Sequence, residues 1–345
     1  MPADERRFIA LDATGGDDAP AATVNGALEA VQSLGLSVYL VGPARRVRRE
    51  LGRFRFLPDG LEIVDAPDVV EMDDSPLVVL RQKKRSPLNV CAELVRDGQA
   101  AAMVTAGNTG AAWVAARSVL GMIEGVERPA LAALLPQRNG HTLVLDVGAN
   151  VDCRPRHLMQ FAVMGALYAE HVLGVTDPRV GLMSVGEEEG KGGKRGREQF
   201  RILSGAGVRF VGNVEGRDVF SGEVDVIVCD GFTGNVILKV AEGLGEMILT
   251  TLREEARRSP VYGAGLLMAK GAFRSLKRRV DYSEYGGAPL LGVGGPCLIG
   301  HGRSSSKAIR NALRSAQMYA KSQVLKRIEA KMPATVEVAE GGGGS

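Results

Sequence analysis

The sequence is poor in aromatic residues and contains no long apolar run. Phe, Trp and Tyr together make up 5% of its 345 residues, and there is a single Trp. No apolar stretch reaches the roughly 18–20 residues of a membrane-spanning helix, and the charged start leads into a strand pattern rather than a secretory signal. These absences predict a cytoplasmic protein without a membrane span.

Motifs for metals and common cofactors are also missing. The cysteines lie far apart in apolar contexts and form no CxxC pair, which indicates buried free thiols rather than a zinc or redox centre; they are Cys91, Cys153, Cys229 and Cys297. GxGxxG and the P-loop pattern are absent, so dinucleotide and nucleoside triphosphate binding lack their usual support. We therefore expect no metal and no cofactor.

The charge is nearly balanced, with 43 Lys and Arg against 40 Asp and Glu. A net charge of +3 does not favour a nucleic-acid partner, so any basic surface must be local. We expect one large α/β domain over residues 1–332, as a single body or as two intimately joined lobes. Residues 333–345, which end in GGGGS, are expected to form a tail and linker outside the fold.

Short β-rich runs alternate with longer helical patterns, which is typical of parallel strands joined by crossover helices. The expected strands are residues 8–12, 37–41, 101–105, 142–146, 179–184, 208–211 and 224–229. The expected helices are residues 20–34, 109–120, 155–173, 233–252 and 304–328. This pattern predicts an open, doubly wound and mostly parallel sheet.

Small polar loops follow six of the apolar runs, including one at residues 296–300. They are DATGGD from Asp12, AGNTG from Ala106, DVGANVD from Asp146, VGEEEGKGG from Val185, CDGFTGN from Cys229 and HGRSS from His301. Ligands of open α/β sheets bind outside the carboxyl ends of the strands, so we expect these loops to converge in one crevice. Several open a helix, whose N–H groups and dipole favour an anion. The loops predict a phosphate or carboxylate ligand.

Each loop also has a structural interpretation. Asp12, Asp146 and Asp230 end strands, where a carboxylate caps a turn as readily as it binds a ligand. AGNTG alone is more typical of a helix cap than of a phosphate site. Lys191 suits either a mobile cationic loop or a solvated charge run, and His301 suits a structural role as well as a catalytic one. The repetition of such loops, rather than any one of them, favours a site.

At these loops the sequence resembles the phosphate acyltransferases of the PlsX type, which form acyl phosphate from acyl carrier protein thioesters and orthophosphate. The resemblance runs from about residue 8 to about residue 320. The motifs that carry it are IALDATGGD, TAGNTGA, LDVGANVDCRPRHLMQFAVMGALYAE, RVGLMSVGEEEGKGG, FVGNVEGRDVFSGEVDVIVCDGFTGNVILK and YGGAPLLGVGGPCLIGHG. The departures from the family pattern are Thr14, Asp18, Ala19, Arg85, Pro87 and Arg303.

The resemblance implies a fold like that of the isocitrate and isopropylmalate dehydrogenases and the phosphate acetyltransferases. It implies a homodimer that acts at the inner face of the membrane in phospholipid synthesis. Its partners there are acyl carrier protein, inorganic phosphate and a downstream glycerol-3-phosphate acyltransferase. Two alternatives are an isopropylmalate-type dehydrogenase, testable spectrally with NAD, and a noncatalytic scaffold that binds acyl carrier protein at the membrane, which turnover would exclude.

The expected chemistry needs no Ser-His-Asp triad, because a thioester is already activated and orthophosphate is anionic near neutral pH. Neither GxSxG nor a Cys/His pair occurs, which favours direct attack of phosphate over an acyl-enzyme. Catalytic roles are assigned to Asn108, Lys191, Asn235 and His301. Substrate binding is assigned to Asp12, Gly15, Gly16, Asp17, Gly107, Thr109, Gly110, Asp146, Asn150, Asp230 and Gly234. The division between phosphate binding and oxyanion stabilisation stays open.

A basic amphipathic segment lies within residues 253–280. Its apolar positions from Tyr262 to Val280 recur at spacings of four and three, with basic residues on other faces. The expected contacts with the membrane, or with acidic acyl carrier protein, are Lys270, Phe273, Arg274 and Lys277. A surface helix packed on its own domain or on a dimer partner is the alternative, and three glycines weaken the helix.

Overall fold

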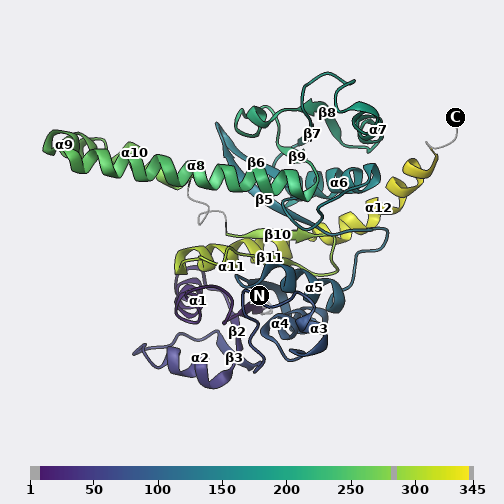
Figure 1. Cartoon of the computed structure of the whole chain (residues 1–345). Helices are drawn as coiled ribbons and strands as arrows, with labels where there is room; N and C mark the ends of the chain where they lie inside the picture. Colours follow the sequence, from purple (N-terminus) through teal and green to yellow (C-terminus); the bar gives the residue numbers. More distant parts are fainter. Residues whose placement is uncertain (1–7, 281–285, 342–345) are drawn as a thin grey trace, which may run out of the picture.

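An 11-stranded sheet runs through the molecule (Figure 1), and the computed structural model describes residues 8–280 and 286–341. The order across the sheet is β3-β2-β1-β4-β11-β10-β5-β6-β9-β7-β8. The strands are β1 (Phe8–Asp12), β2 (Val38–Gly42), β3 (Leu61–Asp65), β4 (Ala100–Thr105), β5 (Ala130–Gln137), β6 (Gly140–Leu145), β7 (Arg179–Met183), β8 (Arg209–Val214), β9 (Val226–Val228), β10 (Ala288–Leu291) and β11 (Cys297–Ile299).

Short polar residues begin several of the helices. The side chains of Ser86, Asn108, Asp230 and Ser305 each accept a hydrogen bond from the backbone N–H three residues ahead, which is the usual N-cap geometry. The helices are α1 (Ala21–Leu34), α2 (Ala44–Leu51), α3 (Val78–Arg81), α4 (Pro87–Arg96), α5 (Thr109–Val119), α6 (Pro155–His171), α7 (Gly193–Ser204), α8 (Gly231–Arg258), α9 (Pro260–Met268), α10 (Lys270–Val280), α11 (Ser306–Lys321) and α12 (Val324–Gly341), with a short 3-10 helix η1 (Gly216–Phe220).

Helices cover both faces of the sheet, because successive side chains of a strand point to opposite faces and inner strands such as β1 and β4 are buried on both. Ile9 and Leu11 point to one face, where they join the core under α1 and α11, whereas Ala10 points to the other face with α4 and α5. The predicted α/β architecture with a large, mostly parallel sheet is therefore confirmed.

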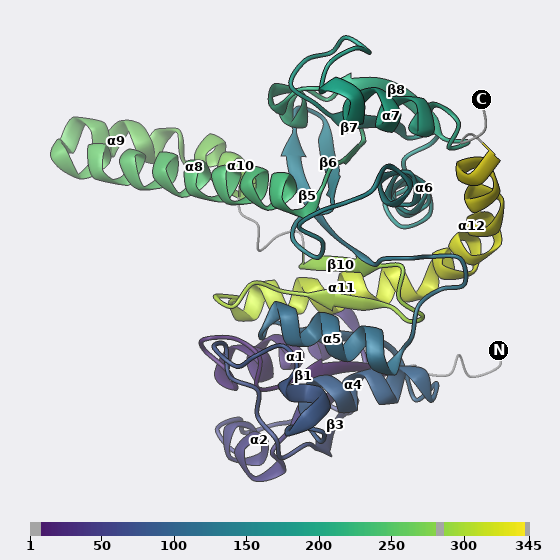
Figure 2. The same ribbon diagram turned by 45° about the vertical axis from the view of Figure 1, so that its right-hand side comes forward.

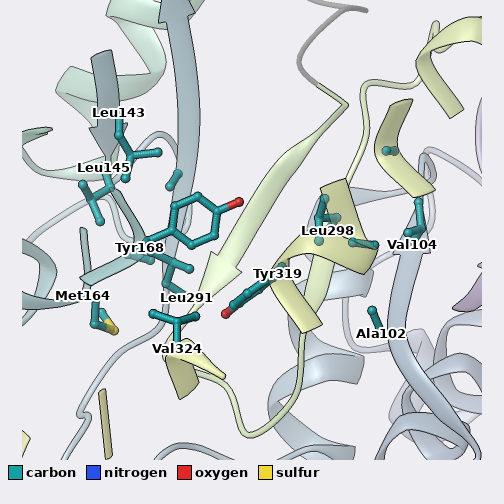
Figure 3. Close-up of a cluster of buried hydrophobic side chains, with 14 of the residues drawn as sticks. Ala102, Val104, Leu143, Leu145, Met164, Tyr168, Leu291, Leu298, Tyr319 and Val324 are labelled. Carbon is teal, nitrogen blue, oxygen red and sulfur yellow. The ribbon is translucent and has the colours of Figure 1, made fainter. Parts of the chain in front are cut away.

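One buried cluster crosses between the two halves of the sheet. Figure 3 shows Tyr168 of α6 beside Tyr319 of α11, with Leu291 of β10 and Val324 of α12 near them. The two tyrosine rings meet edge to face, with centroids 5.3 Å apart and an interplanar angle of 78°. Such aromatic pairs contribute roughly 0.5–1.5 kcal/mol beyond the burial of their surface. The halves are thus joined by side-chain packing as well as by strand pairing.

The central strands reverse the direction of the sheet. β10 pairs antiparallel with β11 and with β5, and β5 pairs antiparallel with β6. The other strand pairs are parallel. Because three antiparallel pairings separate β11 from β6, strands β6, β9, β7 and β8 run opposite to β1, β2, β3, β4 and β11.

A long arm extends from the second half of the sheet. Helix α8 leaves the body, and α9 and α10 lie beside its far part in both views (Figures 1 and 2). The prediction of a single amphipathic segment over residues 253–280 is therefore wrong in detail. It comprises the end of α8 and two separate helices, because Ser259 and Pro260 begin a new helix and α9 ends at Met268.

Other predicted elements need correction. Strands β3, β5 and β10 and helices α2, α3, α4 and α7 were not expected. The single helix predicted at residues 304–328 is two, α11 and α12, because the chain turns at Gln323, where φ is +52°. The tail expected from Pro333 begins inside α12, which continues to Gly341. Residues 342–345 lie outside the described part of the chain.

Candidate active site

The six polar loops fall into two groups according to the direction of the strands that precede them. The strands that precede them run in opposite directions in the two halves, so their carboxyl ends fall at opposite ends of β10. The first loop group comprises residues 12–17, 105–110 and 300–305, after β1, β4 and β11. The second comprises residues 146–153, 184–195 and 229–235, after β6, β7 and β9. The reversal arises at β5 and β10, which were not expected, and convergence of the six loops in one crevice stays a prediction.

In the first loop group, Thr105 joins the ends of two strands. Its hydroxyl donates to Asp12 Oδ2 at 2.8 Å and accepts from the Gly107 N–H at 3.0 Å. Asp12 Oδ1 accepts from both the N–H and the hydroxyl of Thr14 at 2.9 Å. Burial raises the pKa of Asp12, while the bonds from Thr14 and Thr105 lower it in part. This buried carboxylate organises the loops, and substrate contact by Asp12 stays a prediction.

Gly15 packs where no side chain fits. A Cβ added there would lie 2.7 Å from Asp12 Oδ2 and 2.7 Å from the Gly107 nitrogen. The Asp17 N–H donates to the Gly302 carbonyl at 2.8 Å, which ties the first loop to the third. Gly15, Gly107 and Gly302 are therefore explained by close approach of the loops themselves, whatever ligand they bind.

Asn108 is buried, and both ends of its amide are engaged. Its Oδ1 accepts from the Ala111 N–H at 2.9 Å and begins α5, while its Nδ2 donates to the carbonyls of Met72 and Asp74 at 3.0 and 2.9 Å. The side chain thus clamps the loop before α3 onto the start of α5. Its predicted catalytic role stays a prediction.

The loops that lead into two helices meet in this group. The loops before α5 and α11 are in contact, because the Gly300 N–H donates to the Thr105 carbonyl at 2.6 Å. The first N–H groups of each helix have no partner within the helix and carry its positive dipole end. Thr109 and Arg303 are exposed at these two starts, and His301 accepts from the Arg303 N–H at 3.1 Å. The arrangement suits a small anion.

The second loop group is built around Asp146, which is fully buried. Its Oδ1 accepts from the N–H groups of Leu131, Gly148 and Ala149, and its Oδ2 accepts from the N–H and the side-chain amide of Asn150. Asn150 also donates to the Pro129 carbonyl at 2.7 Å. Burial raises the pKa of Asp146, and these bonds offset part of that rise. Both side chains hold the loop, and their predicted contact with substrate stays a prediction.

The start of α8 packs tightly on this loop. Asp230 caps the helix by accepting from the Thr233 N–H at 2.8 Å, and the Gly231 N–H donates to the Asn150 carbonyl at 2.7 Å. A Cβ at Gly234 would overlap the carbonyl oxygen of Asp146. Gly234 is therefore required by packing between α8 and the end of β6.

Cationic side chains border the second group. Arg195 donates to Asp152 Oδ1 at 2.6 Å and to the Cys153 carbonyl, which fastens the start of α7 to the loop after β6. Lys191 is exposed, with a loose ion pair to Glu188 at 3.8 Å, and Asn235 is exposed on α8. Lys191 and Asn235 belong to the second loop group, whereas Asn108 and His301 belong to the first, and a site shared by these residues stays a prediction.

Comparison with known proteins identifies the family. Residues 8–327 match the family model described as "Fatty acid synthesis protein". The chain is 49% identical over 336 residues to a phosphate acyltransferase of Pelotomaculum thermopropionicum, with 97% of each chain covered. It is 48% identical over 324 residues to the phosphate acyltransferase of Trichlorobacter lovleyi, with 94% of each covered. The chain belongs to the phosphate acyltransferase family.

Solved structures support the fold of this acyltransferase. A phosphotransacetylase from Streptococcus pyogenes matches with a TM-score of 0.63 at 16% identity, covering 91% of this chain and 95% of that one. A phosphotransacetylase from Staphylococcus aureus matches with a TM-score of 0.59 at 13% identity, covering 91% and 94%. The fold is thus shared with phosphotransacylases. The family makes the chain an enzyme, so the dehydrogenase and scaffold alternatives are set aside.

The cysteines of the acyltransferase are buried. Desolvation raises the pKa of Cys153 and of Cys297 to about 12, and it raises the pKa of Cys91 and Cys229 well above the ordinary value. A thiol attacks thioesters as its thiolate, so these groups are poor nucleophiles near neutral pH. Within residues 8–280 and 286–341, no group of three or more His, Cys, Asp or Glu side chains is arranged to hold a metal ion.

Two residues that connect the loops were missed by sequence reasoning. Thr105 lies directly before AGNTG, and the position of a hydroxyl at a strand end was the only available signal. Arg195 reaches a residue 43 positions away, and nothing in the local sequence indicates that contact. The remaining assignments of site residues stay predictions.

Proposed function

We propose that the enzyme transfers a fatty acyl group from acyl carrier protein to inorganic phosphate, and that the acyl phosphate feeds phospholipid synthesis. Membership of the phosphate acyltransferase family supports acyl transfer to phosphate. The observation that carries the proposal is the contact between the loops that lead into α5 and α11, each of which opens a helix. A dianion is stabilised at such helix starts.

The reaction needs one tetrahedral intermediate. A phosphate oxygen forms a bond to the thioester carbonyl carbon, and the carbonyl π electrons move onto its oxygen. When the carbonyl re-forms, the C–S bond breaks and the carrier leaves as a thiolate that takes a proton from solvent. The enzyme must align the two substrates and stabilise the oxyanion, for which one hydrogen-bond donor contributes about 3–4 kcal/mol.

We assign phosphate to the first loop group. The donors are the backbone N–H groups at Thr109 and Gly110 and at the start of α11, with Arg303 as an exposed cation beside them. The Asn108 amide positions these groups by capping α5. Lys191 and Asn235 keep their predicted catalytic role as candidates in the second loop group, where direct contact with this phosphate is not expected.

Incubation with acyl-acyl carrier protein and labelled phosphate tests the reaction. Labelled acyl phosphate and free carrier should appear together, and omission of phosphate should abolish release of the carrier. Arg303→Ala should raise the KM for phosphate, whereas Arg314→Ala, an exposed arginine farther along α11, should not. Carrier release that does not depend on phosphate would overturn the proposal.

We also propose that α9 and α10 contact the membrane at its inner face, where the product passes to a glycerol-3-phosphate acyltransferase. Large apolar side chains are exposed on α9, with Met268 at 91% and Val261 at 76%. Lys270 and Arg274 are exposed on α10, and Phe273 is half-buried. No described helix is both long and apolar enough to span a bilayer. Apolar side chains beside cations favour shallow binding to anionic lipid.

A homodimer is the third part of the proposal. Exposed apolar side chains recur every three or four residues along α8, and they are Phe232, Val236, Val240, Leu244, Met247 and Ile248. Such a continuous stripe on a projecting helix is typical of an interface. A second copy of the chain, related by a two-fold axis, would cover the stripe with the same residues.

A further inference from the structure

Residues 44–57 carry an unusual concentration of positive charge. Six of these residues are arginine, none is lysine and one is glutamate, which gives a net charge of +5. The whole chain has a net charge of only +3, so the remaining residues are net negative. The excess charge of the segment is therefore a local feature of helix α2 and the turn that follows it.

Helix α2 separates its two faces. Val47 and Leu51 are buried against the body, whereas Arg45, Arg48 and Arg49 are exposed. In the described part of the chain, the segment forms a single ion pair, between Arg53 and Glu50 at 2.8 Å. The three exposed helical arginines therefore have no carboxylate partner among the described residues.

Apolar side chains extend this face. Phe56 is 79% exposed and Leu57 is 52% exposed, in the turn that follows α2. The guanidinium of Arg55 lies over the Phe56 ring, 5.9 Å from its centroid. Arginine binds carboxylates with two parallel hydrogen bonds, and interfaces are enriched in arginine and aromatic residues. Exposed Phe and Leu side chains are not expected on a charged face that contacts only water.

The position of α2 connects this face with the first loop group. Gly42, just before the helix, packs against Thr14, because a Cβ there would lie 3.2 Å from the threonine methyl. Arg46 donates to the Ala19 carbonyl at 3.0 Å, at the end of the loop after β1. A protein bound on the exposed face of α2 would therefore lie beside the helix starts assigned to phosphate.

We propose that Arg45, Arg48, Arg49, Arg55, Phe56 and Leu57 form the surface that docks the acidic carrier protein. This arginine surface rests on the proposed function, since it identifies where the thioester substrate is recognised. The carboxylates of the carrier protein would pair with the arginines, and an apolar side chain of the carrier would cover Phe56. The basic helix α10 lies on the arm (Figures 1 and 2), whereas α2 lies against the first loop group.

The test is the triple variant Arg45→Glu, Arg48→Glu, Arg49→Glu in the full chain. Complementary charge raises association rates by roughly 10–10³-fold, so the KM for acyl-acyl carrier protein should rise about tenfold or more. The kcat and the KM for phosphate should stay within about twofold, because none of the three arginines is assigned to the reacting groups. Phe56→Ser, which changes no charge, should also raise the KM for acyl-acyl carrier protein.

Three comparisons make the test decisive. The triple variant Lys321→Glu, Lys326→Glu, Arg327→Glu reverses the same charge on exposed positions of α11 and α12 and should leave the KM for the carrier unchanged. An acyl-pantetheine thioester, which lacks the carrier protein, should react equally with wild type and variant. Thermal unfolding of both triple variants checks that the fold is intact.

Direct binding separates this inference from the proposed reaction. If no acyl phosphate forms in any mixture, the proposed function fails, and calorimetric titration of the carrier still tests the surface. Equal carrier affinity in wild type and in the α2 variant would overturn the docking surface. Loss of binding to anionic vesicles with an unchanged KM for the carrier would also overturn it, since the arginines would then contact lipid.

Discussion

The side-chain oxygen of Asn108 accepts a hydrogen bond from the Ala111 N–H at 2.9 Å, and this bond begins helix α5. The nitrogen of the same amide holds the carbonyls of Met72 and Asp74. A residue chosen from the sequence as a catalytic donor is thus a cap and a clamp. Its effect on catalysis should pass through the position of the first loop group.

Asn108→Ala should therefore lower stability as well as turnover. Loss of the cap costs about 0.5–2 kcal/mol, and each lost hydrogen bond about 0.5–1.5 kcal/mol. We expect a decrease of about 2–3 kcal/mol in the free energy of unfolding, measured with urea. Lys191→Ala, which removes an exposed side chain, should lower turnover with a stability change of about 0.5 kcal/mol or less. Wild-type stability in Asn108→Ala would show that the clamp contributes nothing.

The buried thiols predict resistance to alkylation. At pH 8, Cys153 and Cys297 are almost fully protonated because their pKa values are about 12, and Cys91 and Cys229 are shifted in the same direction. Iodoacetamide should leave the native enzyme unmodified over the time in which the urea-unfolded chain reacts completely. Single-turnover mixtures with acyl-acyl carrier protein should contain no acylated enzyme. A stable acyl group on Cys or Ser would contradict direct attack by phosphate.

The ion pair between Arg179 and Asp225 predicts a pH-dependent contribution to stability. Arg179 Nε lies 2.9 Å from Asp225 Oδ2, and its backbone N–H donates to the same oxygen at 2.8 Å. Burial raises the pKa of Asp225, but the bonds from Arg179 prevail and lower it below the ordinary 3.8. Because the pKa of Asp225 is lower in the folded state than in the unfolded state, its ionised carboxylate stabilises the fold above about pH 4. This stabilisation is lost as the pH falls through the folded-state pKa.

Asp225→Asn should accordingly lower the free energy of unfolding by about 1.5–3 kcal/mol at pH 7. The difference from wild type should stay constant between pH 8 and pH 5 and should shrink as the pH approaches 3. Asp177→Asn is the control, because its pair with Arg209 is exposed and contributes little. Urea unfolding across this pH range measures both variants. A difference that does not change with pH would rule out the ion pair as the cause.

The sequence predicted the parallel parts of the fold because each is encoded locally. Phe8–Asp12 is a short apolar run that is buried from Ile9 onward, and Asn108 caps the helix expected from residue 109. β10 has four residues, with a proline, and β5 is rich in Ala and Leu rather than in β-branched residues, so neither carried a recognisable strand pattern. Those two strands reverse the sheet direction. Their omission explains why the division of the six loops into two groups was not expected.

The site was predictable as a set of loops but not as a set of contacts. Glycines and small polar residues marked the loops that follow β1, β4, β6, β7, β9 and β11. Whether a polar side chain there faces a ligand depends on long-range partners, such as Thr105 for Asp12, which are 93 residues apart. The buried roles of Asp146 and Asn150 follow from the packing of β5 and α8, and local sequence does not report such packing.

The exposed stripe on α8 predicts a dimer that single charges disrupt. Val240→Glu and Leu244→Glu each place a carboxylate in the interface formed with a second copy, where an unpaired buried charge is costly. Light scattering coupled to gel filtration should give the mass of a dimer for wild type and of a monomer for each variant at micromolar concentration. Glu246→Lys, on another face of α8, should remain dimeric. A monomeric wild type would contradict the assignment of this stripe.

The arm predicts reversible binding to anionic membranes. Leu267 and Met268 are exposed on α9, and Lys270 and Arg274 follow on α10 together with Lys277. Each cation near an anionic surface contributes about 1 kcal/mol, so Lys270→Glu, Arg274→Glu, Lys277→Glu should lower the vesicle partition coefficient roughly 100-fold and remove its salt dependence. Leu267→Ser with Met268→Ser should weaken binding but keep the salt dependence, because only the apolar contact is lost.

Cosedimentation with vesicles that contain anionic lipid, measured beside turnover, separates the membrane role of the arm from a role in catalysis. The charge-reversed control on Lys321, Lys326 and Arg327 should bind vesicles like wild type, since those residues lie on α11 and α12. Turnover in solution should change less than vesicle binding in the arm variants. Unchanged vesicle binding refutes the membrane contact. Lost turnover with intact folding instead assigns the cations of α10 to the carrier protein, in competition with the arginine surface on α2.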